Sequence, residues 1–194
     1  MRKFIIIFTL FLNLFGYSEL EFKSLSAGFT QTITSQNQKI IYTGSISIDS
    51  DFGAFWQYNT PTQKSIYISN NKITIIEPQL QQAIITNLQN SPDITQILNN
   101  AQKLSDNKFQ TTYDDITYDI VVENSNPKLI SYTDKLGNIA TIEFHQTIKN
   151  SPINKELLTP KIPSDYDIIS NQKFLSELLS GIKFSIFGSS GIAG

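Results

Sequence analysis

Apolar and polar residues alternate along most of this chain, and this two-residue period restricts its fold more than any other feature. Successive side chains of a β-strand point to opposite faces of the sheet, so alternation predicts strands with one buried face. Residues 28–34, for example, place Phe29, Gln31 and Ile33 on one side and three threonines on the other. The same pattern, bounded by turn residues, predicts nine further strands, at 40–49, 52–58, 63–69, 72–77, 82–86, 109–113, 117–123, 128–133 and 139–147.

Turns and helices account for the segments between these strands. The pair Asn70-Asn71 suits a hairpin turn because asparagine tolerates positive φ, and residues 134–138 form a turn between the last two strands. Residues 92–103 have helical spacing, with Ser91 or Asp93 available as the N-cap and an apolar face made of Ile94, Ile97, Leu98 and Ala101. A shorter helix is expected over 19–27, with partly buried Leu20, Phe22 and Leu25.

Around ten short strands with one inserted helix predict a mainly β protein of the α+β class, built on a single antiparallel sheet. A sheet of that size twists and tends to curl, which gives it one concave face. The helix over 92–103 is expected to cover that face above an apolar pocket. A sandwich of two sheets fits the same number of strands.

The first residues have the layout of an export signal. Arg2 and Lys3 precede the apolar run 4–15, and Gly16-Tyr17-Ser18 places small residues where a signal peptidase cuts. The run is shorter than the roughly 20 residues that cross a bilayer, so a cleaved signal is favoured over an anchor. We therefore expect a signal peptide at 1–18, one domain at 19–170, and a C-terminal extension at 171–194 with a helix and a flexible tail.

The composition argues against catalysis, metal binding and nucleic-acid binding. The chain has no cysteine and one histidine, His145, whereas a zinc site needs three or four nitrogen or sulfur ligands. Asp114 and Asp115 are adjacent and are expected in or beside a turn. Without Arg2 and Lys3 the chain has 15 − 2 = 13 basic and 17 acidic residues, and no basic face. No enzymatic activity, cofactor, metal or nucleic-acid partner is expected.

Several segments, in order and at matching spacing, resemble the LolA family of periplasmic outer-membrane lipoprotein carriers. The resemblance runs over about 29–169. Each segment alone is a weak signal, and their shared order makes the resemblance specific. The segments are Phe29-Thr30-Gln31, Gly44-Ser45-Ile46, Phe55-Trp56-Gln57-Tyr58 with Pro61, Ile68-Ser69-Asn70-Asn71-Lys72, Glu77-Pro78, Gln82-Ala83, Asp134-Lys135-Leu136-Gly137, Ile142-Glu143-Phe144, Asn150 and Ile162-Pro163.

The resemblance implies an incomplete β-barrel with a helical lid over an apolar cavity. Proteins of this family accept lipoproteins released from the inner membrane by the ATP-driven LolCDE complex, cross the periplasm, and deliver them to LolB or directly to the outer membrane. LolB has a similar fold but carries a lipid-modified cysteine, which this chain lacks. The resemblance therefore implies a soluble periplasmic carrier of lipoprotein acyl chains, expected to be a monomer.

The family match also points one face of the tryptophan strand toward the cavity. The residues expected to bind acyl chains, each with ordinary core packing as the alternative, are Phe52, Trp56, Tyr58, Ile94, Ile97, Leu98, Ile130, Ile142 and Phe144. Many family members have a basic residue before the tryptophan strand that helps to close the lid. This chain has Asp49-Ser50-Asp51 there instead, which leaves the control of its lid open.

Two other classes of function fit the same sheet. One is a periplasmic lipid-binding sensor or adaptor, and the other is a secreted structural β protein without a sizeable pocket. The segment 174–187 combines a helical stripe with strand-like spacing. It is expected either to dock at the cavity mouth in competition with lipid or to lie as a helix on the outer surface.

Overall fold

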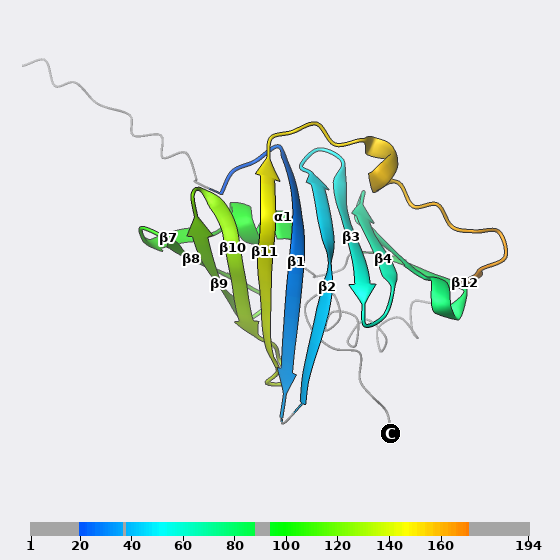
Figure 1. Ribbon diagram of the computed structural model, residues 1–194, viewed down its shortest axis with the longest axis horizontal. Coiled ribbons are helices and arrows are strands. Elements are labelled where there is room, and N and C mark those ends of the chain that lie inside the picture. The colour runs from blue at the N-terminus through cyan, green and yellow to red at the C-terminus, as the bar shows by residue number, and fades with distance from the viewer. Residues whose placement is uncertain (1–19, 37, 88–93, 171–194) are drawn as a thin grey trace, which may run out of the picture.

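The computed structural model describes residues 20–36, 38–87 and 94–170, which form one twelve-stranded sheet with three short helices (Figure 1). The helices are η1 (Pro78–Leu80), α1 (Ile94–Asn99) and η2 (Lys155–Leu158). The strands are β1 (Ser24–Ser35), β2 (Gln38–Asp49), β3 (Gly53–Thr60), β4 (Lys64–Ser69), β5 (Lys72–Glu77), β6 (Gln82–Asn87), β7 (Gln102–Ser105), β8 (Lys108–Tyr113), β9 (Ile116–Glu123), β10 (Asn126–Thr133), β11 (Ile139–Lys149) and β12 (Asp167–Ile169).

The strand order is β12-β6-β5-β4-β3-β2-β1-β11-β10-β9-β8-β7. Hairpins connect most neighbours, and β11 returns beside β1, so the first strand lies in the middle of the sheet. Every pairing is antiparallel except that of β12 with β6, which is parallel. The prediction of a single, essentially antiparallel sheet is confirmed, and the two-sheet sandwich is wrong.

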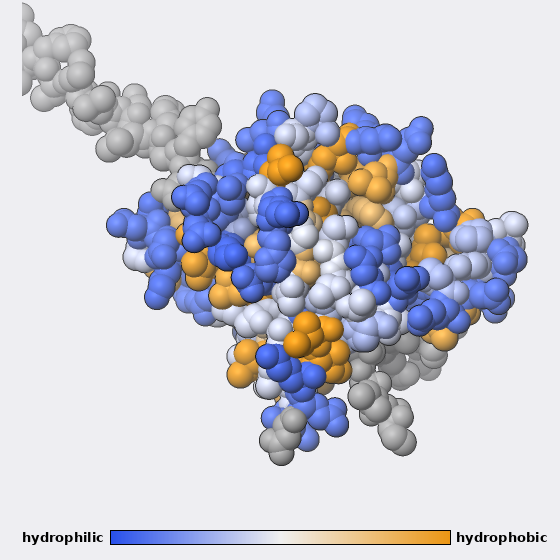
Figure 2. Space-filling view, viewed as in Figure 1, coloured by the Kyte–Doolittle hydropathy of each residue, from blue (hydrophilic) through white to orange (hydrophobic). Residues whose placement is uncertain are grey.

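The sheet is strongly curved. A sheet of this many strands would be roughly 50 Å wide if it were flat, and strand twist makes so wide a sheet curl. Here the buried side chains on one face of β2–β5 and of β8–β11 belong to a single hydrophobic cluster. That face is the concave face, and α1 packs on it, behind the sheet in Figure 1. The opposite face is mostly hydrophilic, with separate hydrophobic patches (Figure 2).

Positive φ angles define the tight turns. Asn70 and Asn71 have φ of 48° and 60°, as a two-residue hairpin loop with a primed turn requires. Asp114 and Asp115 have φ of 49° and 62° in the turn between β8 and β9. Both predicted turns are confirmed, and Asp114-Asp115 is a turn pair whose Asp114 forms an ion pair with Lys135.

The helix expected over 19–27 is wrong, because Leu20 and Phe22 follow the two-residue period of the strand. Both side chains are buried while Glu21 and Lys23 are exposed, and β1 begins at Ser24. From Ser24 onward, pairing with β2 and β11 supplies the backbone hydrogen bonds that a helix would otherwise have to provide. Among the described residues, no helix precedes β1.

The internal helix is shorter than predicted. It ends at Asn99, and Gln102 and Lys103, which were predicted to end the helix, belong to β7 at one edge of the sheet. Pairing with β8 satisfies the backbone hydrogen bonds of the four β7 residues, all of which are exposed. The single apolar side chain among them, Leu104, is 61% exposed, so packing gives little support to a helix there. The N-cap candidates Ser91 and Asp93, the signal peptide at 1–18 and the extension at 171–194 lie outside the described residues.

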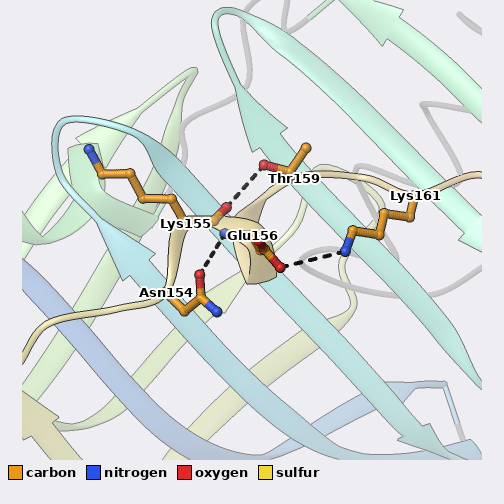
Figure 3. Close-up of polar contacts among 5 residues, drawn as sticks. All are labelled: Asn154, Lys155, Glu156, Thr159 and Lys161. Carbon is orange, nitrogen blue, oxygen red and sulfur yellow. Dashed lines mark hydrogen bonds and ion pairs between the residues drawn. The ribbon is translucent and has the colours of Figure 1, made fainter.

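After β11 the chain crosses the outer side of the sheet to reach β12. The short helix η2 contacts β3 on this path, and Leu158 is buried there. The Asn154 side chain accepts a hydrogen bond from the Glu156 backbone N–H at 3.0 Å, and Lys161 pairs with Glu156 at 3.8 Å (Figure 3). The contact of η2 with β3 and the burial of Leu158 attach the connection to the sheet, whereas the polar contacts lie within the connection itself.

Candidate functional site

An aromatic group lies at the centre of the concave face. Phe29 from β1 makes edge-to-face contacts with Trp56 and Tyr58 from β3, both at 5.1 Å between ring centroids. Tyr42 from β2 meets Tyr58 at 5.9 Å. All four rings are buried. Because three neighbouring strands place these rings on one face, the group depends on the register of the sheet as well as on residue type.

Gly44 makes room for this group. A Cβ atom at Gly44 would lie 2.7 and 2.8 Å from two ring carbons of Phe29, and 2.0 Å from the carbonyl oxygen of Gln57 on the next strand. The Phe29 ring therefore lies against bare backbone of β2, directly opposite Gly44 in the register. No side chain larger than hydrogen fits there without moving the ring or the strand.

Eight of the nine residues predicted to bind acyl chains lie together in the hydrophobic cluster of the concave face. β3 contributes two of them, α1 three, and the late strands β10 and β11 three more. Each of the eight is at most 2% exposed. They are Trp56, Tyr58, Ile94, Ile97, Leu98, Ile130, Ile142 and Phe144.

Phe52 is the exception, and its expected position beside Trp56 and Tyr58 is wrong. It precedes β3 in a turn, is 36% exposed, and has the Lys155 ammonium 5.5 Å from its ring centroid. Gly53, with φ of 142°, interrupts the strand alternation between Phe52 and Ala54. The two-residue alternation that places Trp56 and Tyr58 on the concave face therefore does not extend past Gly53 to Phe52.

The concave face also holds polar groups. Gln31 on β1 is fully buried, and its Oε1 accepts a hydrogen bond of 3.0 Å from the Tyr58 hydroxyl. Over the described part of the chain, Gln31 Nε2 and Trp56 Nε1 are buried with no hydrogen-bond partner. Both atoms are donors. Burial raises the pKa of Tyr58 well above its usual value, so its hydroxyl stays protonated and remains a donor to Gln31.

Lys64, at the start of β4, places a cation on the same face. Its ammonium lies 4.6 Å from the centroid of Tyr58 and 5.6 Å from that of Tyr42, within the range of cation–π interactions. Burial lowers the pKa of Lys64 to about 8, an effect that the charge of Glu77 partly opposes. Lys64 was not predicted as a site residue, although it shares the two-residue period with Ile66 and Ile68.

Polar chemistry elsewhere in the described residues gives no second site. His145 is half-buried on the outer side of β11, and its Nε2 lies 3.0 Å from the Thr30 hydroxyl, as expected of a polar strand residue. Within 20–36, 38–87 and 94–170, no three His, Cys, Asp or Glu residues gather as metal ligands would. None of the helices in those ranges has the length and apolarity needed to cross a membrane.

Comparisons with known proteins agree with this architecture. The sequence model of the family described as "Outer membrane lipoprotein carrier protein LolA" matches residues 21–115. An outer-membrane lipoprotein carrier protein from Campylobacter jejuni is 36% identical over 169 residues, which cover 87% of this chain and 99% of that protein. One from Helicobacter pylori strain HPAG1 is 33% identical, covering 75% of this chain and 78% of the relative.

A structural likeness supports the fold alone. The crystal structure of an uncharacterised conserved protein from Thermus thermophilus superposes with a TM-score of 0.50 at 8% identity, covering 79% of this chain and 94% of that one. The sequence matches extend over nearly the whole sheet, including the strands that carry the aromatic group. On this similarity, the chain belongs to the LolA family of outer-membrane lipoprotein carrier proteins.

Proposed function

We propose that this chain carries lipoproteins through the periplasm by covering their acyl chains with the concave face of its sheet. In this proposal residues 1–18 are removed on export, 19–170 form the carrier domain, and the protein acts as a monomer without catalysis. The observation that carries the proposal is the conjunction of a large apolar face inside a curved sheet with relatives named as outer-membrane lipoprotein carrier proteins.

The physical problem that such a carrier solves is large. A triacylated lipoprotein anchor has dozens of methylene groups, and each costs about 0.8 kcal/mol to leave in water. Free passage through an aqueous compartment is therefore negligible. A face of isoleucine, leucine and aromatic side chains accepts flexible chains of varied shape, and its few hydrogen bonds allow the cargo to leave again.

The structure is a closed form in this proposal, because the residues that would touch the cargo are buried against one another. The proposed contacts are the eight clustered residues: Trp56 and Tyr58 on β3, Ile130, Ile142 and Phe144 on the late strands, and Ile94, Ile97 and Leu98 on α1. The helix has only six residues and contacts β8. Because only three of its side chains are buried, moving this helix away would open the face at a lower cost in free energy than separating strands. We propose that it acts as the lid.

The proposed route follows from the family. A LolCDE-type complex in the inner membrane would load the carrier, and a LolB-type receptor or the outer membrane itself would receive the cargo. The cation before the tryptophan strand is missing here, since that position reads Asp49-Ser50-Asp51. Lys64, on the concave face beside Tyr42 and Tyr58, is the cation that this chain offers to the site instead.

A release assay tests the proposal directly. Spheroplasts that export lipoproteins are incubated with the purified chain, and lipoproteins in the soluble fraction are measured. The unmodified chain should release them, and Ile97→Glu on α1 should release far fewer. Ile41→Glu is the matched control, because Ile41 is 49% exposed on the other side of the sheet and receives the same charge.

Circular dichroism checks that each variant is folded. Trp56→Glu on the central strand β3 is the second variant, for the case in which Ile97→Glu alone disturbs α1. A folded unmodified chain that releases no lipoprotein would refute the carrier function. Equal release by Ile97→Glu, Trp56→Glu and Ile41→Glu would refute the role of the concave face.

A further inference from the structure

Most buried polar residues of the concave face lie toward one side of the sheet, with Thr86 on β6, in the row of Ile68 and Ile73, as an exception. Because antiparallel neighbours run in opposite directions, the end of β1, the start of β2, the end of β3 and the start of β4 lie on one side of the sheet. The start of β9 and the end of β10 lie on that same side. These strand ends carry what we call the tyrosine end: Gln31, Tyr42, Tyr58, Lys64, Tyr118 and Tyr132.

The other end of the same strands is apolar. There the buried concave-face residues of β1–β4 and β9 are Leu25, Ile48, Ala54, Ile68 and Val122. Most hydroxyl, amide and ammonium groups of the face therefore lie toward one end, where they share the face with buried Ile33 and Ala140, and the other end of these strands is hydrocarbon. A surface that only had to shelter hydrocarbon would gain nothing from this arrangement, since each buried polar group has to be desolvated.

One buried donor of the tyrosine end, on Gln31, and one beside it, on Trp56, point to a ligand. In the described residues, Gln31 Nε2 and Trp56 Nε1 are buried without an acceptor, while the large majority of buried side-chain polar atoms in proteins are hydrogen-bonded. The Tyr58 hydroxyl holds Gln31 by its Oε1 and so leaves the amide nitrogen as the group presented to the site. Lys64 adds an ammonium over the Tyr58 ring. Donors predominate, so the complementary ligand group is a hydrogen-bond acceptor.

We propose that the tyrosine end binds the ester carbonyl groups that join the acyl chains to the glyceryl group of the cargo, with the chains extending toward the apolar end. This inference rests on the proposed carrier function and adds a direction to it. Ester carbonyl oxygens are acceptors without a charge, and they lie at the boundary between hydrocarbon and the polar peptide. They therefore match donors placed at one end of an apolar face.

The test compares two synthetic probes on the full chain. One is a cysteine lipopeptide with an N-palmitoyl group and two palmitoyl esters on its glyceryl group, and the other has ether links in place of the two esters. Both present the same hydrocarbon. We expect the unmodified chain to bind the ester probe about tenfold more tightly, which corresponds to about 1.4 kcal/mol. Gln31→Met should lose a large part of this preference, with Trp56 Nε1 remaining as the second donor.

Ile142→Met is the matched control, because Ile142 is the register partner of Gln31 on β11 and is equally buried. It should change both affinities alike and keep the preference for the ester. If Gln31→Met does not fold, Trp56→Phe takes its place, since it keeps an aromatic ring and removes the indole N–H. Its preference for the ester should fall severalfold.

Equal affinities of the unmodified chain for the two probes would overturn the inference and leave the carrier function standing. An undiminished preference for the ester in the folded Gln31→Met or Trp56→Phe variant would overturn it as well. Failure of the unmodified chain to bind either probe would count against the carrier function itself. The two failures are thus distinguishable.

Discussion

Replacing Gly44 with alanine should destabilise this protein more than its single methyl group suggests. The new Cβ would lie 2.0 Å from the Gln57 carbonyl oxygen, and within 2.8 Å of the Phe29 ring. Relief requires a shift of roughly 1 Å between β2 and β3 or an outward movement of Phe29. Overpacking a core typically costs about 1–3 kcal/mol, and a weakened ladder hydrogen bond adds about 1 kcal/mol, so we expect about 2–4 kcal/mol in total.

Thermal unfolding followed by the emission of Trp56, the single tryptophan, measures the effect. For a chain of this size the expected decrease in Tm is about 5–15 °C. Gly28→Ala is the matched control on the neighbouring strand, because its Cβ would have no neighbour nearer than 3.7 Å. Its stability should change by less than about 0.5 kcal/mol. Equal stabilities of the two variants would refute the packing of Phe29 against the backbone of β2.

Two further predictions concern stability. The pKa of Lys64 is lowered to about 8 in the folded protein from 10.5, so above pH 8 the unfolded chain binds more protons and stability rises with pH. Between about pH 8 and 9.5, the free energy of unfolding measured by urea denaturation should rise by about 2 kcal/mol in the unmodified chain and not in Lys64→Met. A free energy of unfolding that does not change with pH in the unmodified chain would contradict the burial of this ammonium. Asn71 has φ of 60°, a conformation that alanine adopts at a cost and glycine adopts freely. In the same assay Asn71→Ala should lower the free energy of unfolding by about 1 kcal/mol and Asn71→Gly should leave it almost unchanged. Equal losses of stability in the two variants would contradict the primed turn.

The strands were largely predictable because a half-buried sheet imposes its period on the sequence. Residues 72–77 form β5 with the predicted bounds, and the Asn70-Asn71 turn before it is confirmed. The start of β1 was not predicted, because Leu20, Phe22 and Leu25 were interpreted as one helix face. The period of two between Leu20 and Phe22 was the better signal, and pairing with β2 and β11 decided the outcome.

The site was predictable where packing follows from alternation, and not where it depends on backbone geometry or long-range register. Trp56 and Tyr58 lie on the concave face as expected, while the φ of Gly53 turned Phe52 away. Lys64 was missed because lysine is rarely buried, and nothing local shows that the rings of Tyr42 and Tyr58 accommodate its ammonium. The meeting of Gln31 with Tyr58, 27 residues apart, follows from the register of β1, β2 and β3.

The central claim is that acyl chains lie on the concave face, and photocrosslinking tests it most directly. A triacylated lipopeptide with a diazirine in one acyl chain is bound to the unmodified protein and irradiated, and the labelled residues are identified by mass spectrometry. Ile142 and Thr141 are successive residues of β11 and point to opposite faces. We expect label on Ile142 and on its concave-face neighbours, with Thr141 unlabelled. Label confined to the outer face, at Thr141 or Phe55, would contradict the account.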